Sequence, residues 1–247
     1  MPDLYKHNTT PARSAVSYIY YLIVNINMSK ELYFITGNKN KLNEARTILG
    51  MPDLQNIELE PDPGEKQALY ARDVVEKKVM DAYKQLREQK TIDDKAFIFV
   101  EDTGLHIKAW NDHPGALIKW LVKAVGTEGI CRQMKDYPVR DAYAETCIGY
   151  TGGDGTNVKV FSGRVDGIIV DAPRGQTKFA WDPILQPNGH NKTFAEMGIE
   201  EKNNISHRKK AFDEFKEFLD LCELNKRLYR AEKALAHYKG NLDQKGN

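Results

Sequence analysis

From residue 31 onward, the hydrophobic positions of the chain alternate between a spacing of two and a spacing of three to four. Glu31–Thr36 is rich in residues that favour strands, and Leu42–Leu49 has helical spacing. Helical spacing returns over Leu69–Glu88, and the apolar run Phe97–Glu101 that follows is typical of a buried strand. This succession of strands and helices predicts a mixed α/β fold.

The second half of the chain predicts a short helix, a group of strands and a long final helix. The short helix is expected over Leu117–Val125. The segments YAETCIGY, NVKVFSG and GRVDGIIVD read as successive strands, with a glycine-rich hairpin at Thr151–Gly155. The final helix is expected to begin near Ser206, a good N-cap residue, and its apolar stripe thins out after Leu224.

The two ends of the chain differ from this pattern. The apolar stretch Ala15–Ile26 is shorter than the roughly 20 residues that span a bilayer, and no convincing signal-peptide cleavage site follows it. We interpret residues 1–28 as a dispensable extension or an upstream misassigned start, with a targeting segment or an extra strand or helix as alternatives. A catalytic domain is then expected over 29–224, followed by a basic helical tail, 225–247, that fades into disorder.

Charge and cysteine content argue against several classes of protein. The chain has 36 basic and 35 acidic residues, so no net charge points to a nucleic acid or a membrane surface as a partner. Its three cysteines show no spacing typical of a zinc site. Free thiols are usual in a reducing compartment, and we therefore expect a cytoplasmic protein.

A glycine-containing turn joins the first predicted strand to the first predicted helix. The residues of this turn are Thr36, Gly37, Asn38, Lys39, Asn40 and Lys41. The N–H groups and the positive dipole end of a helix N-terminus favour a phosphate, and Lys41 would add a charge. The spacing is not that of a Walker A loop. An ordinary strand, turn and helix with a surface lysine would also account for this segment alone.

Two carboxylates, Glu101 and Asp102, directly follow the apolar strand, where open α/β sheets place their ligands. Side chains alternate along a strand, so only one of the two can point into a given cleft. Such a carboxylate could bind Mg²⁺ or take a proton from water, or it could simply cap the next turn.

Two later segments carry candidates for base recognition. Phe179 and Trp181 would share one face of an extended segment and could stack on a base, although aromatic residues in this pattern are also common in a core. Lys202, His207 and Arg208 gather near the start of the last helix, where they suit an anion or a base edge. A solvated helix end is the alternative for these three residues.

The order of the segments TGNKNK, VEDTG, PGALIKW, PRGQTKFAWDP and AEMGIEEKNNISHR resembles the inosine triphosphate pyrophosphatase family over about residues 32–219. The resemblance implies an elongated central mixed β-sheet flanked by helices, with two lobes and an active-site cleft between them. It also implies a homodimer that hydrolyses non-canonical purine triphosphates (ITP, dITP and XTP) to the monophosphate and pyrophosphate.

The resemblance assigns roles to particular residues. Asp102 and Lys41 are implied to be catalytic, with Asp102 deprotonating the water that attacks the α-phosphorus. Asp102 would also bind Mg²⁺, or Mn²⁺ in its place, together with a glutamate; spacing favours Glu65, and Glu60 is the alternative. The implied substrate contacts are Thr36, Gly37, Asn38, Lys39, Asn40, Lys41, Lys77, Asp102, Thr103, Lys119, Phe179, Ala180, Trp181, Asp182, Lys202, His207 and Arg208.

Two other functions are compatible with these motifs. One is a pyrophosphatase for other modified nucleotides. The other is a non-enzymatic nucleotide- or RNA-binding module that stacks bases on Phe179 and Trp181, although the sequence has no RRM or KH signature. Release of pyrophosphate from ITP would exclude a binding module.

Overall fold

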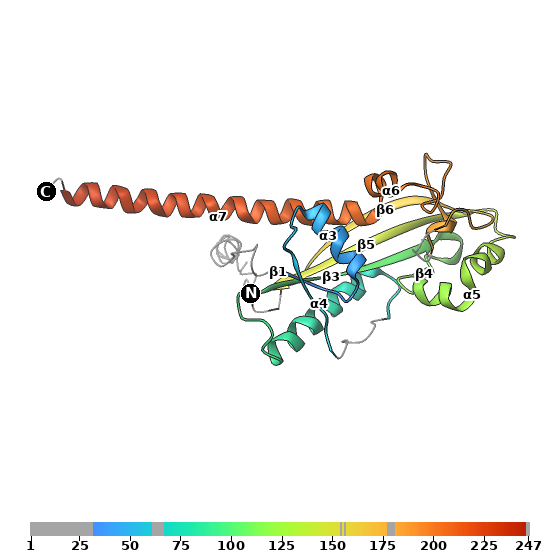
Figure 1. Ribbon diagram of the computed structural model, residues 1–247, viewed down its shortest axis with the longest axis horizontal. Helices are drawn as coiled ribbons and strands as arrows, with labels where there is room; N and C mark the ends of the chain where they lie inside the picture. Colours follow the sequence, from blue (N-terminus) through green and yellow to red (C-terminus); the bar gives the residue numbers. More distant parts are fainter. Residues whose placement is uncertain (1–31, 61–66, 154, 156, 177–180, 246–247) are drawn as a thin grey trace, which may run out of the picture. The chain divides into compact units, whose positions relative to one another are not determined.

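The computed structural model describes residues 32–60, 67–153, 155, 157–176 and 181–245 of the 247-residue chain (Figure 1). Packing divides the chain into two units, one comprising 29–217 and the other 1–28 with 218–247. The expected extension, 1–28, lies outside the described residues. No helix in the described ranges is both long enough and apolar enough to cross a membrane.

Seven strands form one mixed sheet in the part of the chain that the structure describes. The strands are β1 (Leu32–Ile35), β2 (Gln55–Ile57), β3 (Phe97–Ile107), β4 (Pro114–Gly115), β5 (Asp141–Gly152), β6 (Lys159–Ile169) and β7 (Leu185–Pro187). Their order is β2-β1-β3-β5-β6-β7, and β4 pairs with β3. The β1 pairings are parallel and the others antiparallel.

The helices lie around this sheet in the order that the sequence predicts, with additions. They are α3 (Lys39–Leu49), α4 (Ala71–Glu88), α5 (Ile118–Gln133), α6 (Ile199–Ile205) and α7 (His207–Lys245), with 3₁₀ turns η1 (Lys108–Trp110) and η2 (Asp182–Ile184). Ser206 caps α7 as expected, because its Oγ accepts a hydrogen bond of 3.1 Å from the Lys209 N–H.

Helix α4 covers one face of the sheet. Its apolar residues recur at helical spacing and are buried against Ile98, Val100 and Cys147. The helix approaches β5 so closely that a Cβ on Gly149 would lie 2.7 Å from the Val75 carbonyl oxygen. Only glycine therefore allows this contact between helix and sheet.

The opposite face of the sheet is covered in part by the start of α7. Phe34 and Phe99 stack at 4.4 Å between ring centroids, and Phe212 meets both rings edge-on. The ring centroid of Phe215 lies 5.1 Å from that of Phe99. Such aromatic contacts add to the stabilisation that burial of apolar surface provides.

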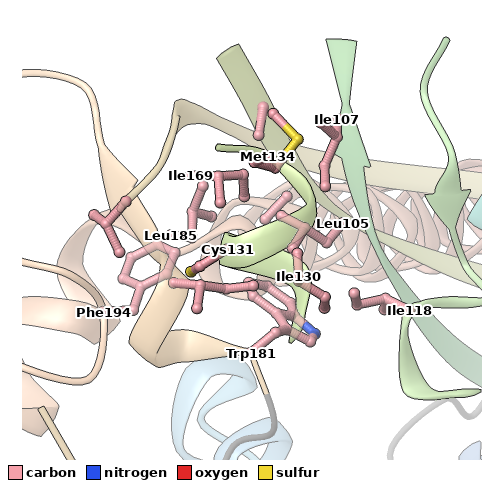
Figure 2. Close-up of a cluster of buried hydrophobic side chains, with 14 of the residues drawn as sticks. Leu105, Ile107, Ile118, Ile130, Cys131, Met134, Ile169, Trp181, Leu185 and Phe194 are labelled. Atoms are coloured by element: carbon pink, nitrogen blue, oxygen red, sulfur yellow. The ribbon is translucent and has the colours of Figure 1, made fainter. Parts of the chain in front are cut away.

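A second hydrophobic cluster forms further along β3 and β5 (Figure 2). Leu105 and Ile107 of β3 pack there with Ile130 of α5, and with Trp181 and Phe194 from the segment before α6. Helix α5 is interrupted at Gly126, which has a positive φ of 70°. The helix predicted over 117–125 therefore ends at a real kink, and the second part of α5 was not predicted.

The structure confirms the α/β class and corrects several element boundaries. The two strands predicted from NVKVFSG and GRVDGIIVD are one continuous strand, β6, so the predicted break at Gly163 is wrong. The helical tail predicted after residue 225 is helical, because α7 continues to Lys245, and no end of the helix is seen before that residue. Strand β3 runs six residues beyond the predicted end at Glu101, to Ile107.

Candidate active site

The site lies beside a stretch of β3 that has no paired strand along one of its two edges. Its pairing with β1 ends at Phe99, and its pairing with β4 begins at Leu105. Between these points, no described strand pairs with that edge of β3. Because Phe34 pairs with Phe99, the turn after β1 is level with Glu101 and Asp102. The expected phosphate turn and the two carboxylates are thus brought together.

The turn after β1 is held in place by its own side chains. The Asn38 Oδ1 caps α3 by accepting hydrogen bonds from the N–H groups of Asn40 (3.0 Å) and Lys41 (3.3 Å). The Thr36 Oγ1 accepts a bond of 3.1 Å from the Asn38 N–H. The turn therefore has the helix N-terminus that the sequence predicts, with two of its N–H groups donating to an oxygen acceptor.

A carboxylate that the sequence analysis missed lies beside this turn. The Glu58 carboxylate approaches the backbone of the turn closely, since a Cβ on Gly37 would be 2.4 Å from the Glu58 Oε1. Glu58 directly follows β2, which runs parallel to β1 with Ile57 opposite Ile35. The signal was available in the sequence, since carboxylates at the ends of adjacent parallel strands meet at one edge of the sheet.

Glu101 and Arg208 form a buried ion pair in the site. The Arg208 Nε and Nη2 donate to the Glu101 Oε1 at 3.0 and 2.8 Å, while Nη1 donates to the Glu44 Oε2 at 2.6 Å. The Lys41 Nζ lies 3.5 Å from the same Glu101 oxygen. The phosphate turn and the start of α7 therefore meet at one carboxylate.

The charges around Glu101 keep it ionised. Burial would raise the pKa of this carboxyl, but the Arg208 and Lys41 charges outweigh burial and lower the pKa to about 2. The Glu101 Oε2 is buried and accepts no hydrogen bond from any described residue. Thr103 also lies on this face, where its hydroxyl donates to the Glu101 Oε1 at 3.2 Å.

Asp102 points to the other face of the sheet, as strand alternation requires. It lies opposite Cys147 of β5, which is buried on the α4 face. Burial, aided by the Glu145 and Asp102 carboxylates, raises the pKa of the Cys147 thiol to about 12. This thiol is therefore neutral and is not a nucleophile.

The predicted base-recognition residues gather around the start of α7. His207 is buried, and its ring centroid lies 5.3 Å from that of Trp181 and 5.9 Å from that of Phe194. Burial, with the Arg208 and Lys202 charges, lowers the His207 pKa to about 3, so the imidazole is neutral. Its Nδ1 is buried without a hydrogen-bond partner among the described residues.

Trp181 and Asp182 are buried in this region. Trp181 belongs to the hydrophobic cluster of Figure 2, which is the alternative that the sequence left open for it. The Asp182 Oδ2 accepts a hydrogen bond of 2.5 Å from the Lys202 Nζ. This contact ties the start of η2 to α6. Phe179 and Ala180 lie outside the described residues, so their predicted contacts with the base stay predictions.

The remaining predicted residues lie at the surface or outside the described residues. Lys77 is exposed on α4, and Lys119 is exposed in the first turn of α5, where its Nζ lies 5.1 Å from the Trp120 ring centroid. Glu65 lies outside the described residues, and Glu60 is exposed. The described residues contain no cluster of three or more His, Cys, Asp or Glu side chains arranged to hold a metal ion.

Comparison with known proteins identifies the family. A model described as the Ham1 family matches residues 32–218. Proteins named inosine triphosphate pyrophosphatase from Kluyveromyces lactis and Schizosaccharomyces pombe are 39% and 36% identical to this chain. These alignments cover 76% and 77% of the chain and 95% and 96% of those proteins.

Solved structures agree with this match. The Ham1 protein of Staphylococcus aureus is 25% identical with a TM-score of 0.63, covering 76% of this chain and 97% of that one. A nucleoside-triphosphatase / dITP/XTP pyrophosphatase from Mycobacterium abscessus is 27% identical with a TM-score of 0.55, covering 74% and 96%. The chain belongs to the Ham1 family, which confirms the resemblance that its motifs indicate.

Proposed function

We propose that this protein hydrolyses the non-canonical purine triphosphates ITP, dITP and XTP to the nucleoside monophosphate and pyrophosphate. The names of its relatives support this reaction. The structural observation that carries the proposal is the position of Glu101. Lys41 of the phosphate turn and Arg208 of α7 both approach its Oε1, so residues suited to the triphosphate and to the base share one site.

The turn after β1 would bind the triphosphate. Its N–H groups at Asn40 and Lys41 already donate to a carboxamide oxygen, the kind of acceptor that a phosphate oxygen would replace. Lys41 would turn from Glu101 to the phosphates and stabilise the charge that builds up on pyrophosphate as it leaves. Lys77 and Lys119, both exposed, are proposed to contact the outer phosphates.

The carboxylates of the site fit a magnesium ion. Mg²⁺ in nucleotide-binding enzymes usually takes one or two carboxylates together with substrate phosphates, so a cluster of three protein ligands is not needed. We propose that Asp102 holds the ion together with Glu58 beside the turn, or with Glu65. The bound ion, Mg²⁺ or Mn²⁺, would neutralise phosphate charge that repels an attacking nucleophile.

Asp102 is proposed to act as the general base. It would take a proton from water while the water oxygen attacks the α-phosphorus, and the bond to the bridging oxygen of pyrophosphate would break. Asp102 points away from the Glu101–Arg208 pair, toward the α4 face of the sheet.

Selection of the base is proposed to depend on His207 and Arg208. The 6-oxo group of hypoxanthine or xanthine accepts hydrogen bonds, whereas adenine presents an amino donor at that position. Arg208 carries only donors, and a neutral His207 offers one donor and one acceptor. An adenine amino group facing Arg208 would leave two donors opposed, which disfavours ATP.

The proposal extends to assembly and location. A homodimer rests on the resemblance to the family alone. A cytoplasmic location rests on free thiols, of which Cys131 and Cys147 are buried. We propose no nucleic-acid or membrane partner. The 36 basic and 35 acidic residues nearly balance, so the protein has no large net positive charge that would attract a nucleic acid or an anionic membrane.

Product analysis tests the reaction. Incubation of ITP with the protein and Mg²⁺ should release equal amounts of IMP and pyrophosphate, and no IDP. The Asp102→Asn variant should lose about 10²-fold or more in turnover. Asp53→Asn, at an exposed turn, is the matched control and should leave turnover unchanged. A protein that binds ITP but releases no pyrophosphate would be a binding module instead.

A further inference from the structure

Helix α7 extends well beyond the part of the chain that the family match explains. The match ends at residue 218, whereas α7 continues to Lys245. The second half of this helix therefore contributes no family motif. A long helix in water gains most of its stability from packing an apolar face against a partner.

The described part of this segment exposes a stripe of leucines. Leu221, Leu224 and Leu228 are 59%, 52% and 54% exposed, and Ala231 is exposed next in the row. In the sequence the same spacing continues at Leu235, Tyr238 and Leu242. Alternating steps of three and four residues give a 3.5-residue repeat, which is the a and d pattern of a two-stranded coiled coil.

A residue on the opposite side of the same helix is buried. Lys226 is only 6% exposed, although it lies between Leu224 and Leu228 in the sequence, and its Nζ is 3.8 Å from the Glu223 Oε1. At 100° per residue, Lys226 lies nearly opposite the leucine stripe. The leucines thus form a separate face that is still open for a partner.

The charges beside the stripe complement those of a second copy of the chain. With Leu221 at position a and Leu224 at position d, Arg227 occupies position g and Glu232 position e of the next heptad. In a parallel coiled coil, a g residue meets the e residue of the partner helix five positions later. Both side chains are exposed, so two symmetric Arg–Glu pairs would form.

We propose that residues 221–242 of two copies of this chain form a parallel, in-register coiled coil. The other g and e pairs of this arrangement are Asp220 with Asn225 and Ala234 with Lys239, and neither places like charges together. The proposal does not depend on the reaction that the protein catalyses, nor on any dimer that the 29–217 unit forms.

Disulfide trapping in the full-length protein tests this arrangement. Cys222 is first replaced by serine, while Cys131 and Cys147 are buried and stay. A Leu228→Cys variant places its thiol on the proposed seam and should form a covalent dimer under mild oxidation. Lys233→Cys, on the opposite side of the helix, is the matched control and should give little dimer. A dimer formed through 29–217 alone would not favour Leu228→Cys over Lys233→Cys.

A charge reversal then tests the pairing across the seam. Adding Arg227→Glu to Leu228→Cys places two glutamates together and should lower the yield of covalent dimer severalfold. Adding Glu232→Arg as well restores opposite charges and should recover the yield. ITP turnover should be the same in all variants. The proposal would be overturned if Leu228→Cys formed no covalent dimer, or if Lys233→Cys formed as much dimer as Leu228→Cys. It would also be overturned if the charge reversal did not change the yield of covalent dimer.

Discussion

Arg208 and Glu101, which are 107 residues apart in the sequence, form the buried ion pair around which the candidate site is built. Two nitrogens of Arg208 donate to one oxygen of Glu101, and a third donates to Glu44. Burial disfavours a charged guanidinium, but the Glu101 and Glu44 carboxylates outweigh this effect and raise the Arg208 pKa. The pair joins the middle of β3 to the start of α7.

The first prediction concerns the stability of this pair. Arg208→Ala would leave the Glu101 carboxylate buried without its main partner, and it should lower the free energy of unfolding by about 3–5 kcal/mol. Lys84→Ala breaks the exposed pair with Glu88 and should cost less than about 1 kcal/mol. Urea unfolding measures both changes. Equal effects of the two substitutions would show that the buried pair has no special role in stability.

The second prediction concerns the pH dependence of stability. His106 is buried between the rings of Tyr70 and Tyr143, with centroids 5.7 and 4.4 Å away. Burial lowers its pKa from 6.5 to about 4, although the Asp112 charge opposes this change; Lys108 and Arg164 lower the pKa further. The unfolded chain therefore binds this proton more readily than the folded protein does.

Stability should accordingly be lost as the pH falls from 6.5 to 4, with His106 contributing up to about 3 kcal/mol. His106→Phe keeps a ring between the two tyrosines and cannot be protonated, so it should make the pH profile of unfolding less steep in this range. The slope that stays includes the contribution of His207, whose pKa is lowered to about 3. His190→Asn is the control and should leave the slope as in the wild type. A His106→Phe profile as steep as that of the wild type would contradict the argument.

Strand β3 and its two carboxylates could be predicted only in part from the sequence. The apolar run 97–101 predicts the start of the strand, but the polar residues that follow hide its continuation to Ile107, which depends on pairing with β5. Strand alternation indicates that Glu101 and Asp102 point to opposite faces. It cannot indicate which of them meets Arg208, because that contact joins distant parts of the chain.

Local signals were predicted well and distant contacts were not. The Asn38 and Ser206 caps depend on residues two or three positions away. The sequence identifies the Ser206 cap, whereas it places the start of the first helix at Leu42, three residues after the observed start of α3 at Lys39. Glu58 lies beside Gly37 only because β1 and β2 are parallel and adjacent. The break predicted at Gly163 failed because pairing with β5 carries β6 straight through that glycine.

The third prediction concerns the N-terminal extension. Deletion of residues 1–27 should leave ITP turnover and the melting temperature of the protein unchanged, since the family match and β1 both begin at Leu32. Activity and calorimetry on the shortened protein provide the test. Aggregation or a lower melting temperature would instead assign the apolar stretch Ala15–Ile26 to a core or an interface.

The fourth prediction concerns selection of the base by Arg208. Arg208→Lys keeps a positive charge beside Glu101 but loses the fixed fork of donors. The ratio of kcat/KM for ITP to that for ATP should fall by about tenfold, or roughly 1.4 kcal/mol. Lys209→Ala, one residue further along α7, should leave the ratio unchanged. Equal losses for both nucleotides would limit Arg208 to a structural or phosphate-binding role.

The most direct test of the account is a comparison of kcat/KM for ITP, XTP, GTP and ATP with the wild-type protein, measured as pyrophosphate release. One mismatched pair of hydrogen bonds costs roughly 1–3 kcal/mol, so ITP and XTP should exceed ATP by about tenfold to a hundredfold or more. GTP shares the 6-oxo group with ITP but carries a 2-amino group, so its kcat/KM shows separately how the site treats that amino group. A kcat/KM for ATP equal to that for ITP, or no pyrophosphate from either, would contradict the proposed function.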